Sequence, residues 1–181
     1  MLIFTLIVVI VIIFVVFYLV QSMVSRRIET ETAFEDLEMQ LDKRVEIIPN
    51  LVIFIQNYLE YDRPKSEEPS KCRGHMNELL KLKQQLDNPN ISIEKMNELD
   101  RKLTAKLKTV MKDSEEYPEL MSNSNMITLR SSLQNINEQI VEARETYNST
   151  VSTYNMALNK PQNKLVSLFL NERPRTMFET P

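Results

Sequence analysis

The chain has 181 residues, of which 22 are basic and 25 are acidic, so its formal net charge is −3. This balance offers no excess of Lys and Arg for binding phosphates, and we therefore expect no nucleic-acid partner. The composition includes one glycine, Gly74, which nearly excludes tight hairpins, Rossmann turns, P-loops and nucleophile elbows. The one cysteine, Cys72, excludes an internal disulfide framework.

Residues 2–20 read LIFTLIVVIVIIFVVFYLV, a run without a charge. At ~1.5 Å per residue the run makes about 29 Å of helix, the thickness of a bilayer's hydrocarbon core. It is longer than the apolar run of a cleaved signal peptide, and no Lys or Arg precedes it. We therefore predict a retained membrane anchor, with the bilayer as the first partner and with these representative lipid-facing residues: Leu2, Phe4, Phe14, Phe17, Tyr18 and Val20.

The orientation of the anchor is predicted from the charges beside it. Arg26 and Arg27 follow the apolar run, whereas only the α-amino group precedes it. Because membrane proteins keep positive flanks on the cytoplasmic side, we expect a short N-terminus outside and the remaining chain in the cytoplasm.

The first polar segment, residues 25–62, has one apolar stripe with steps of three and four, typical of an amphipathic helix. The stripe consists of Phe34, Leu37, Leu41, Val45, Ile48, Val52, Ile55 and Leu59. No Pro or Gly lies between Val20 and Phe34, so this helix can continue the membrane helix. Pro49 removes one backbone donor from it, and the sequence leaves two alternatives: a bent helix, or a helix that ends at Ile48 and restarts.

Two shorter helices are predicted after the segment 62–70, in which Pro64 and Pro69 indicate a break. The first carries Cys72, Met76, Leu79, Leu80 or Leu82, and Leu86 on one side, and residues 87–90 end it. The second has Ser92 as its expected N-cap and runs to about Lys112. Its stripe consists of Met96, Leu99, Leu103, Leu107 and Val110 or Met111. Residues 113–124 are expected to form the next connection.

Residues 126–158 form the most regular amphipathic pattern. Their stripe consists of Met126, Leu129, Leu133, Ile136, Ile140, Ala143, Tyr147, Val151, Tyr154 and Leu158. So long a stripe needs a long partner, and only the helix with the stripe 34–59 matches it. The predicted fold is therefore all-α: a transmembrane helix (residues 1–24), an antiparallel bundle of long helices of the four-helix type (25–160) and an apolar tail (161–181).

The tail contains an apolar cluster that includes Leu165, Leu168 and Phe169. We expect a short helix here, packed on the bundle or lying on the membrane interface, followed by an irregular end. The cluster is too short to span a bilayer and too apolar for water, so these three residues are the predicted contacts with a partner.

Neither a metal nor a catalytic centre is predicted. Cys72 and His75 have the i, i+3 spacing of two metal ligands, but a structural zinc needs four ligands and the chain has no second Cys or His. A nucleophilic site would also need an oxyanion nest, which is hard to build with one glycine. We expect no cofactor and no enzymatic activity.

A set of polar residues recurs at helix positions where side chains are expected to meet. It consists of Arg44, Asn50, Arg144, Tyr147, Asn148, Tyr154 and Asn155. The two interpretations are a layer that binds a ligand and a set of hydrogen bonds that fixes the register of the helices, and we favour the second. The two tyrosines are expected in the core with their hydroxyls at its edge.

Several stretches resemble the LemA family: residues 41–52 (LDKRVEIIPNLV), 117–120 (YPEL), 143–148 (ARETYN) and 154–155 (YN). Together with the N-terminal apolar run and the apolar tail, the resemblance covers nearly the whole polar part and is weakest over residues 65–111. It implies long helices behind one membrane helix, and it brings no established catalytic residues. Leu170-Asn171 departs from the Gly-Phe usual in the family, which affects how the tail docks.

Two function classes follow. The first is a membrane-anchored scaffold, without catalysis, that binds other membrane or membrane-proximal proteins or copies of itself, as a structural component of an envelope assembly. The second is an accessory or sensor subunit of an envelope enzyme or transporter, with a small ligand in the polar layer.

Overall fold

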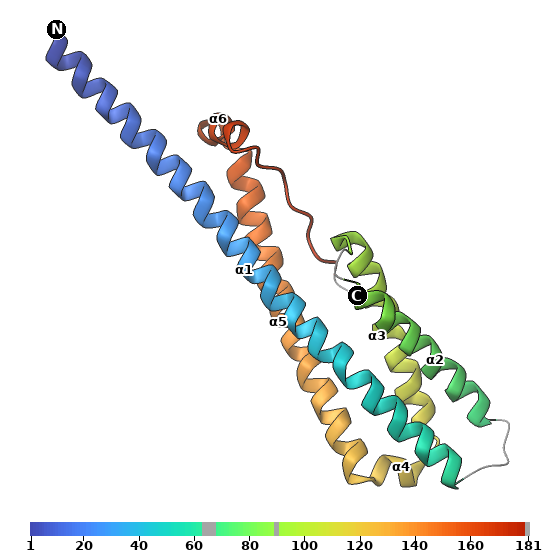
Figure 1. Ribbon diagram of the computed structural model, residues 1–181. Helices are drawn as coiled ribbons and strands as arrows, with labels where there is room; N and C mark the ends of the chain where they lie inside the picture. The colour runs from blue at the N-terminus through green and yellow to red at the C-terminus, as the bar shows by residue number, and fades with distance from the viewer. Residues whose placement is uncertain (63–67, 89–90, 180–181) are drawn as a thin grey trace. The chain divides into compact units, whose positions relative to one another are not determined.

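The computed structural model describes residues 1–62, 68–88 and 91–179, which form six α-helices and no strand (Figure 1). Their bounds are α1 Leu2–Asp62, α2 Glu68–Leu86, α3 Ile93–Ser114, α4 Pro118–Ser122, α5 Ser124–Leu158 and α6 Pro161–Phe169. The predicted all-α class is confirmed for these residues. The predicted break at 62–70 falls largely on residues 63–67, which lie outside the described residues.

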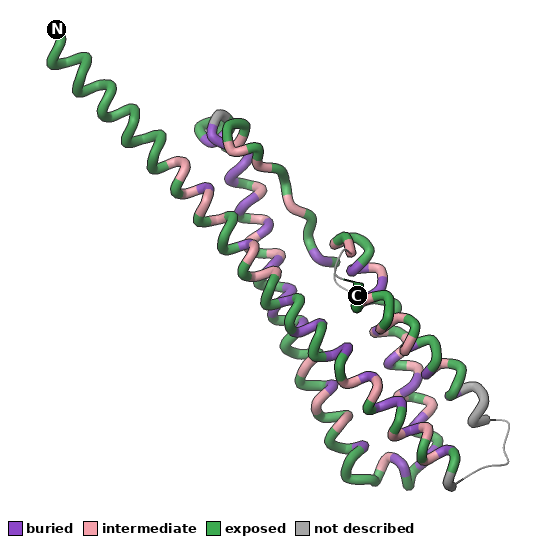
Figure 2. Tube along the Cα trace, in the orientation of Figure 1, coloured by how far each residue is buried: buried purple, intermediate pink, exposed green. Residues whose placement is uncertain are grey.

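Helix α1 is continuous over 61 residues. Its first seventeen residues, 2–18, are exposed along the whole surface of the helix (Figure 2), although their only polar side-chain groups are the hydroxyls of Thr5 and Tyr18. By length and composition α1 is able to cross a membrane. Pro49 lies inside it, so of the two alternatives the helix continues through the proline instead of ending at Ile48.

The chain divides into two compact units. Unit 1 contains residues 1–37 and 143–177, and unit 2 contains residues 38–142 and 178–181. This division differs from the predicted boundaries after residues 24 and 160. The tail after α6 belongs to unit 1 up to Met177, where its backbone is hydrogen-bonded to side chains of α5 in that unit.

Unit 2 has one hydrophobic core to which α1, α2, α3, α4 and α5 all contribute, and α2 packs along α3. The predicted stripes supply most of it, namely Val45, Ile48, Val52, Ile55, Leu59, Cys72, Met76, Leu79, Leu103, Leu107, Val110, Met126 and Leu133. Leu51, Tyr117 and Leu120 join this core from outside the predicted stripes. Each fully buried aliphatic side chain of this kind contributes roughly 1.5–3 kcal/mol relative to exposure.

Unit 1 has a smaller core at the junction of α1, α5 and α6. Met23, Tyr154, Ala157, Leu158 and Val166 are buried there, and Leu19, Val20 and Leu170 pack against them. Helix α6 starts at Pro161, whose missing N–H is tolerated in a first turn, and it runs across the end of α5 (Figure 1).

Helix ends follow local chemistry. The Ser92 side chain accepts a hydrogen bond from the Lys95 N–H, which confirms the predicted N-cap of α3. Helix α2 already begins at Glu68, which places Pro69 in its first turn, where proline is tolerated. Within the predicted connection 113–124, Pro118 starts the short α4, an element that the periodicity analysis did not predict because it is too short for a pattern.

The end of α6 is a Schellman motif. Asn171 has a φ of 52°, the left-handed region that asparagine tolerates better than most residues. The Glu172 N–H donates to the Ser167 carbonyl at 2.9 Å, and the Asn171 N–H donates to the Leu168 carbonyl at 3.2 Å. Asn171 therefore supplies the turn that sends the tail back toward α5, without a glycine.

The continuity of α1 predicts the effect of Pro49→Ala. Alanine restores an N–H to donate to the Val45 carbonyl and has the higher helix propensity, so the free energy of unfolding should rise or stay within about 1 kcal/mol. Urea denaturation followed by circular dichroism measures it. A loss of several kcal/mol would instead mean that the proline separates two helices.

Candidate functional site

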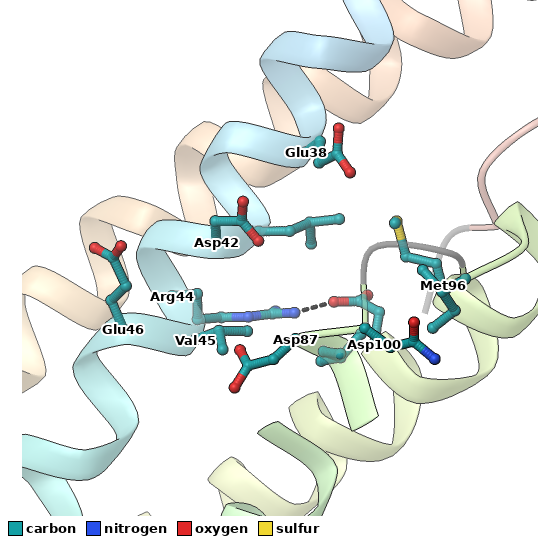
Figure 3. A pocket seen from close by; sticks show the side chains of 12 residues that line it. Glu38, Asp42, Arg44, Val45, Glu46, Asp87, Met96 and Asp100 are labelled. Carbon is teal, nitrogen blue, oxygen red and sulfur yellow. Dashed lines mark hydrogen bonds and ion pairs between the residues drawn. The ribbon is translucent and has the colours of Figure 1, made fainter. Parts of the chain in front are cut away.

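A buried ion pair joins two helices of unit 2. The Arg44 Nη2 of α1 contacts the Asp100 Oδ1 of α3, and the two side chains are 3% and 4% exposed (Figure 3). Arg44 Nη1 also donates to the Thr104 hydroxyl at 3.1 Å. A charge this deeply buried is tolerated only with a partner, so the pair fixes how α1 and α3 face each other.

A cavity of about 360 Å³ lies beside this ion pair. Apolar side chains line part of its wall, namely those of Leu41, Val45, Leu86, Ile91 and Met96, and the side chains of Glu38, Asp42, Glu46 and Asp87 line another part. Partial burial, followed by the nearby charges of Glu46 and Asp87, raises the pKa of Asp42. The carboxyl groups in this lining suit a small cationic group.

Cys72 and His75 occupy different environments on α2. Cys72 lies in the core of unit 2, and burial raises the pKa of its thiol to about 11, so it is protonated at neutral pH. His75 is half-buried, and its Nδ1 lies 2.7 Å from the Asp113 Oδ2. Among the residues that the structure describes, no group of His, Cys, Asp or Glu is arranged to hold a metal ion.

In unit 1, side chains of α5 hold the extended tail that follows α6. Asn155 clamps one residue of the tail through two bonds of 2.9 Å: its Nδ2 donates to the Arg175 carbonyl, and its Oδ1 accepts from the Arg175 N–H. The Tyr147 hydroxyl donates to the Thr176 carbonyl at 2.9 Å. The amide of Asn155 therefore satisfies the backbone of a segment that has no strand partner.

Charged residues connect the tail to α1 as well. Arg175 contacts Glu31 at 2.7 Å, and Arg27 contacts both Glu31 at 3.0 Å and Glu172 at 3.5 Å. Hydrogen bonds from Arg175 and Arg27 lower the pKa of Glu31. The Tyr154 hydroxyl donates to Glu172 at 2.6 Å, and burial together with this bond raises the pKa of Tyr154 to about 12, so the donor keeps its proton.

The predicted polar set is not one layer. Arg44 belongs to unit 2, whereas Arg144, Tyr147, Asn148, Tyr154 and Asn155 belong to unit 1. Arg144, Tyr147 and Tyr154 are buried, and Asn148 and Asn155 are half-buried. Asn50 corrects the expectation: it is exposed, because the neighbouring Ile48, Leu51 and Val52 turn their face of α1 into the core.

Sequence reasoning missed the partners of these residues. Asp100 follows Leu99 of the apolar stripe of α3, so its position in the sequence was a signal that this carboxylate is buried. No spacing rule, however, connects Asp100 to Arg44. Glu172 and Arg175 lie in a segment without periodicity. In the predicted partner contact of the tail, Leu168 and Phe169 are 73% and 87% exposed, and the side chain of Leu165 lies outside the described residues.

Breaking the buried ion pair should destabilise the protein. Asp100→Ala leaves the Arg44 charge in the core, and we expect a loss of about 3–5 kcal/mol in the free energy of unfolding by urea denaturation. The double variant Arg44→Met with Asp100→Leu should lose much less of the free energy of unfolding, because it leaves no unpaired charge in the core. Glu98→Gln is the matched surface control, since Glu98 pairs with Lys95 and Lys102 in solvent, and it should change little. An Asp100→Ala variant as stable as this control would contradict the structural role.

Removing the Asn155 clamp should release the tail. Asn155→Ala deletes two hydrogen bonds of ~1 kcal/mol each, so the tail should open roughly thirtyfold more often. Limited trypsin digestion after Arg175, which precedes Thr176, and hydrogen exchange of the tail amides measure this opening. Asn159→Ala, which removes an exposed amide bonded within α5, is the control. Equal cleavage rates in the two variants would refute the clamp.

Comparison with known families gives a match whose residues include the clamp, the buried ion pair and the tail. The LemA family model matches residues 33–181, which is most of the chain and begins within α1. Comparison with curated proteins gives no significant match. The predicted resemblance is confirmed: the chain belongs to the LemA family.

Proposed function

We propose that this protein is a membrane-anchored helical scaffold without catalytic activity. Residues 2–20 cross the bilayer with the N-terminus outside, and the remaining helices form an antiparallel bundle in the cytoplasm that binds other proteins or further copies of this chain. The observation that carries the proposal is the continuity of α1. The same helix is apolar and exposed over its first seventeen residues, and between Val45 and Leu59 it contributes side chains to the core of unit 2.

Lipid is the environment that fits the first part of α1. Seventeen consecutive exposed residues, about five helical turns, cannot hide these side chains in water. A bilayer solvates them and leaves every backbone group bonded within the helix. Met23 is the first buried residue of the helix, so the exposed apolar surface ends where the core of unit 1 begins.

The nature of the reactive side chains supports a role without catalysis. The thiol of Cys72 is buried and protonated, and the imidazole of His75 is engaged by a carboxylate on α3. In unit 1, hydrogen bonds from Arg175 and Arg27 account for the lowered pKa of Glu31, and burial with the bond to Glu172 accounts for the raised pKa of Tyr154. The contacts that hold the tail thus explain both shifts without a catalytic role.

Candidate contact surfaces lie outside the cores. Unit 2 exposes large apolar side chains on its helices, namely Met39, Ile53, Ile127 and Val141, and unit 1 exposes Leu168 and Phe169 on α6. Tethering to a membrane confines the copies to two dimensions and raises their effective concentration, so even weak contacts between such surfaces support assembly.

The orientation is testable by labelling one cysteine in intact cells. Cys72 itself is unsuitable because it is buried. Gly74 is exposed, and a Cβ added there meets no neighbour within 4 Å, so Gly74→Cys in a Cys72→Ala background places a thiol on the surface. It should resist a membrane-impermeant maleimide until the cells are lysed. Labelling before lysis would place this domain outside.

The size of the extracted protein tests the scaffold. After extraction in a mild detergent, light scattering should give a mass well above that of one 21.3 kDa chain, or a stable complex with another protein. A monomer at every concentration, without a co-purifying partner, would refute the role. The sensor alternative has one observation in its favour, the cavity beside Arg44, and it predicts that a polyamine such as spermidine raises the melting temperature.

A further inference from the structure

The outer face of α6 is the most exposed apolar surface beyond the N-terminal run. Leu168 and Phe169 are 73% and 87% exposed, although they follow Val166, which is buried. Lys160 and Lys164 are exposed on the same short segment. A helix that buries one apolar side and presents a second one flanked by lysines is typical of an element in contact with two different apolar environments.

The core of unit 1 fixes where this face lies along α1. Val166 of α6 is buried together with Met23, and Leu19 and Val20 pack against the same cluster. These residues immediately follow Tyr18, the last member of the exposed apolar run. Helix α6 is therefore packed at the level where α1 changes from an apolar, uncovered surface to a covered one.

The direction of α6 fits the same level. Figure 1 shows α6 nearly end-on where α1 and α5 are seen from the side, so α6 runs across them. If α1 crosses a bilayer, a helix that runs across it lies along the bilayer surface. The run Leu2–Tyr18 is about 24 Å long, slightly shorter than a hydrocarbon core, so the boundary of the core falls beside α6.

We infer that Leu168 and Phe169 insert into the lipid interface beside the anchor, with Lys160 and Lys164 among the headgroups. The inference rests on the proposed membrane anchor and names lipid as the partner of the predicted tail contact. The two lysines extend long stems along apolar surface while their ammonium groups stay among phosphates, which also adds positive charge on the side of Arg26 and Arg27. Helix α6 thus works as a second, shallow contact that sets the orientation of unit 1 on the membrane.

Single-tryptophan variants test this placement, because the chain contains no tryptophan. Phe169→Trp reports on α6, and Ile10→Trp, at an exposed position in the apolar run, reports on the anchor. Met177→Trp is the matched control: Met177 is 45% exposed, and its neighbour Thr176 is bonded to Tyr147, about 16 Å along α5 from the end near α6. Each full-length variant is reconstituted into vesicles of phosphatidylcholine and phosphatidylglycerol with brominated acyl chains.

Bromine should quench the F169W and I10W variants and leave M177W unquenched, whereas aqueous iodide should quench only M177W. Quenching of I10W by bromine, together with quenching of F169W by iodide, would overturn the inference and leave the anchor intact. If bromine leaves I10W unquenched, the anchor itself fails. If F169W is shielded from both quenchers and becomes accessible to iodide on dilution of the protein in lipid, a second copy covers α6, which also overturns the inference.

Discussion

Continuity of α1 is the constraint on which the remaining structure depends. Because no residue between Val20 and Phe34 breaks the helix, one continuous helix carries both the apolar run and the side chains that contribute to the core of unit 2. Pro49 removes one hydrogen bond without ending the helix, since the apolar side chains on either side of it are buried in one core.

The tail is held by a different kind of interaction, in which polar side chains satisfy an extended backbone. Asn171 turns the chain at the end of α6, and Asn155 and Tyr147 then bond the backbone of the returning segment. Half-burial costs an amide or hydroxyl group little free energy once the group is hydrogen-bonded. These groups therefore provide a specific contact without a large buried apolar area. The effect is that α6 and the residues after it are fixed to the part of α1 that follows the apolar run.

Charged groups serve two purposes in the described residues. The ion pair of Arg44 and Asp100 is buried, so the cost of desolvating the two charges offsets much of their attraction. Its main effect is therefore on the arrangement of α1 and α3 and not on the total stability. A second group is more exposed and consists of Arg27, Glu31, Glu172 and Arg175. Its members form a network, which contributes more to stability than an isolated surface ion pair does. Both sets lie where two segments distant in sequence must stay in register.

The sequence by itself determined the helices other than the short α4, their apolar faces and the resemblance to the family, because helical periodicity, proline positions and the Ser92 cap are local properties of the chain. It also identified Asn155, Tyr147 and Arg44 as unusual polar residues on those helices. Only the tertiary structure decided their partners: Asp100 for Arg44 and the tail backbone for Asn155, with Asn50 left on the outside. A hydrogen bond depends on which segments meet in space, and segments such as the tail, which have neither period nor cap, carry no local signal of where they pack.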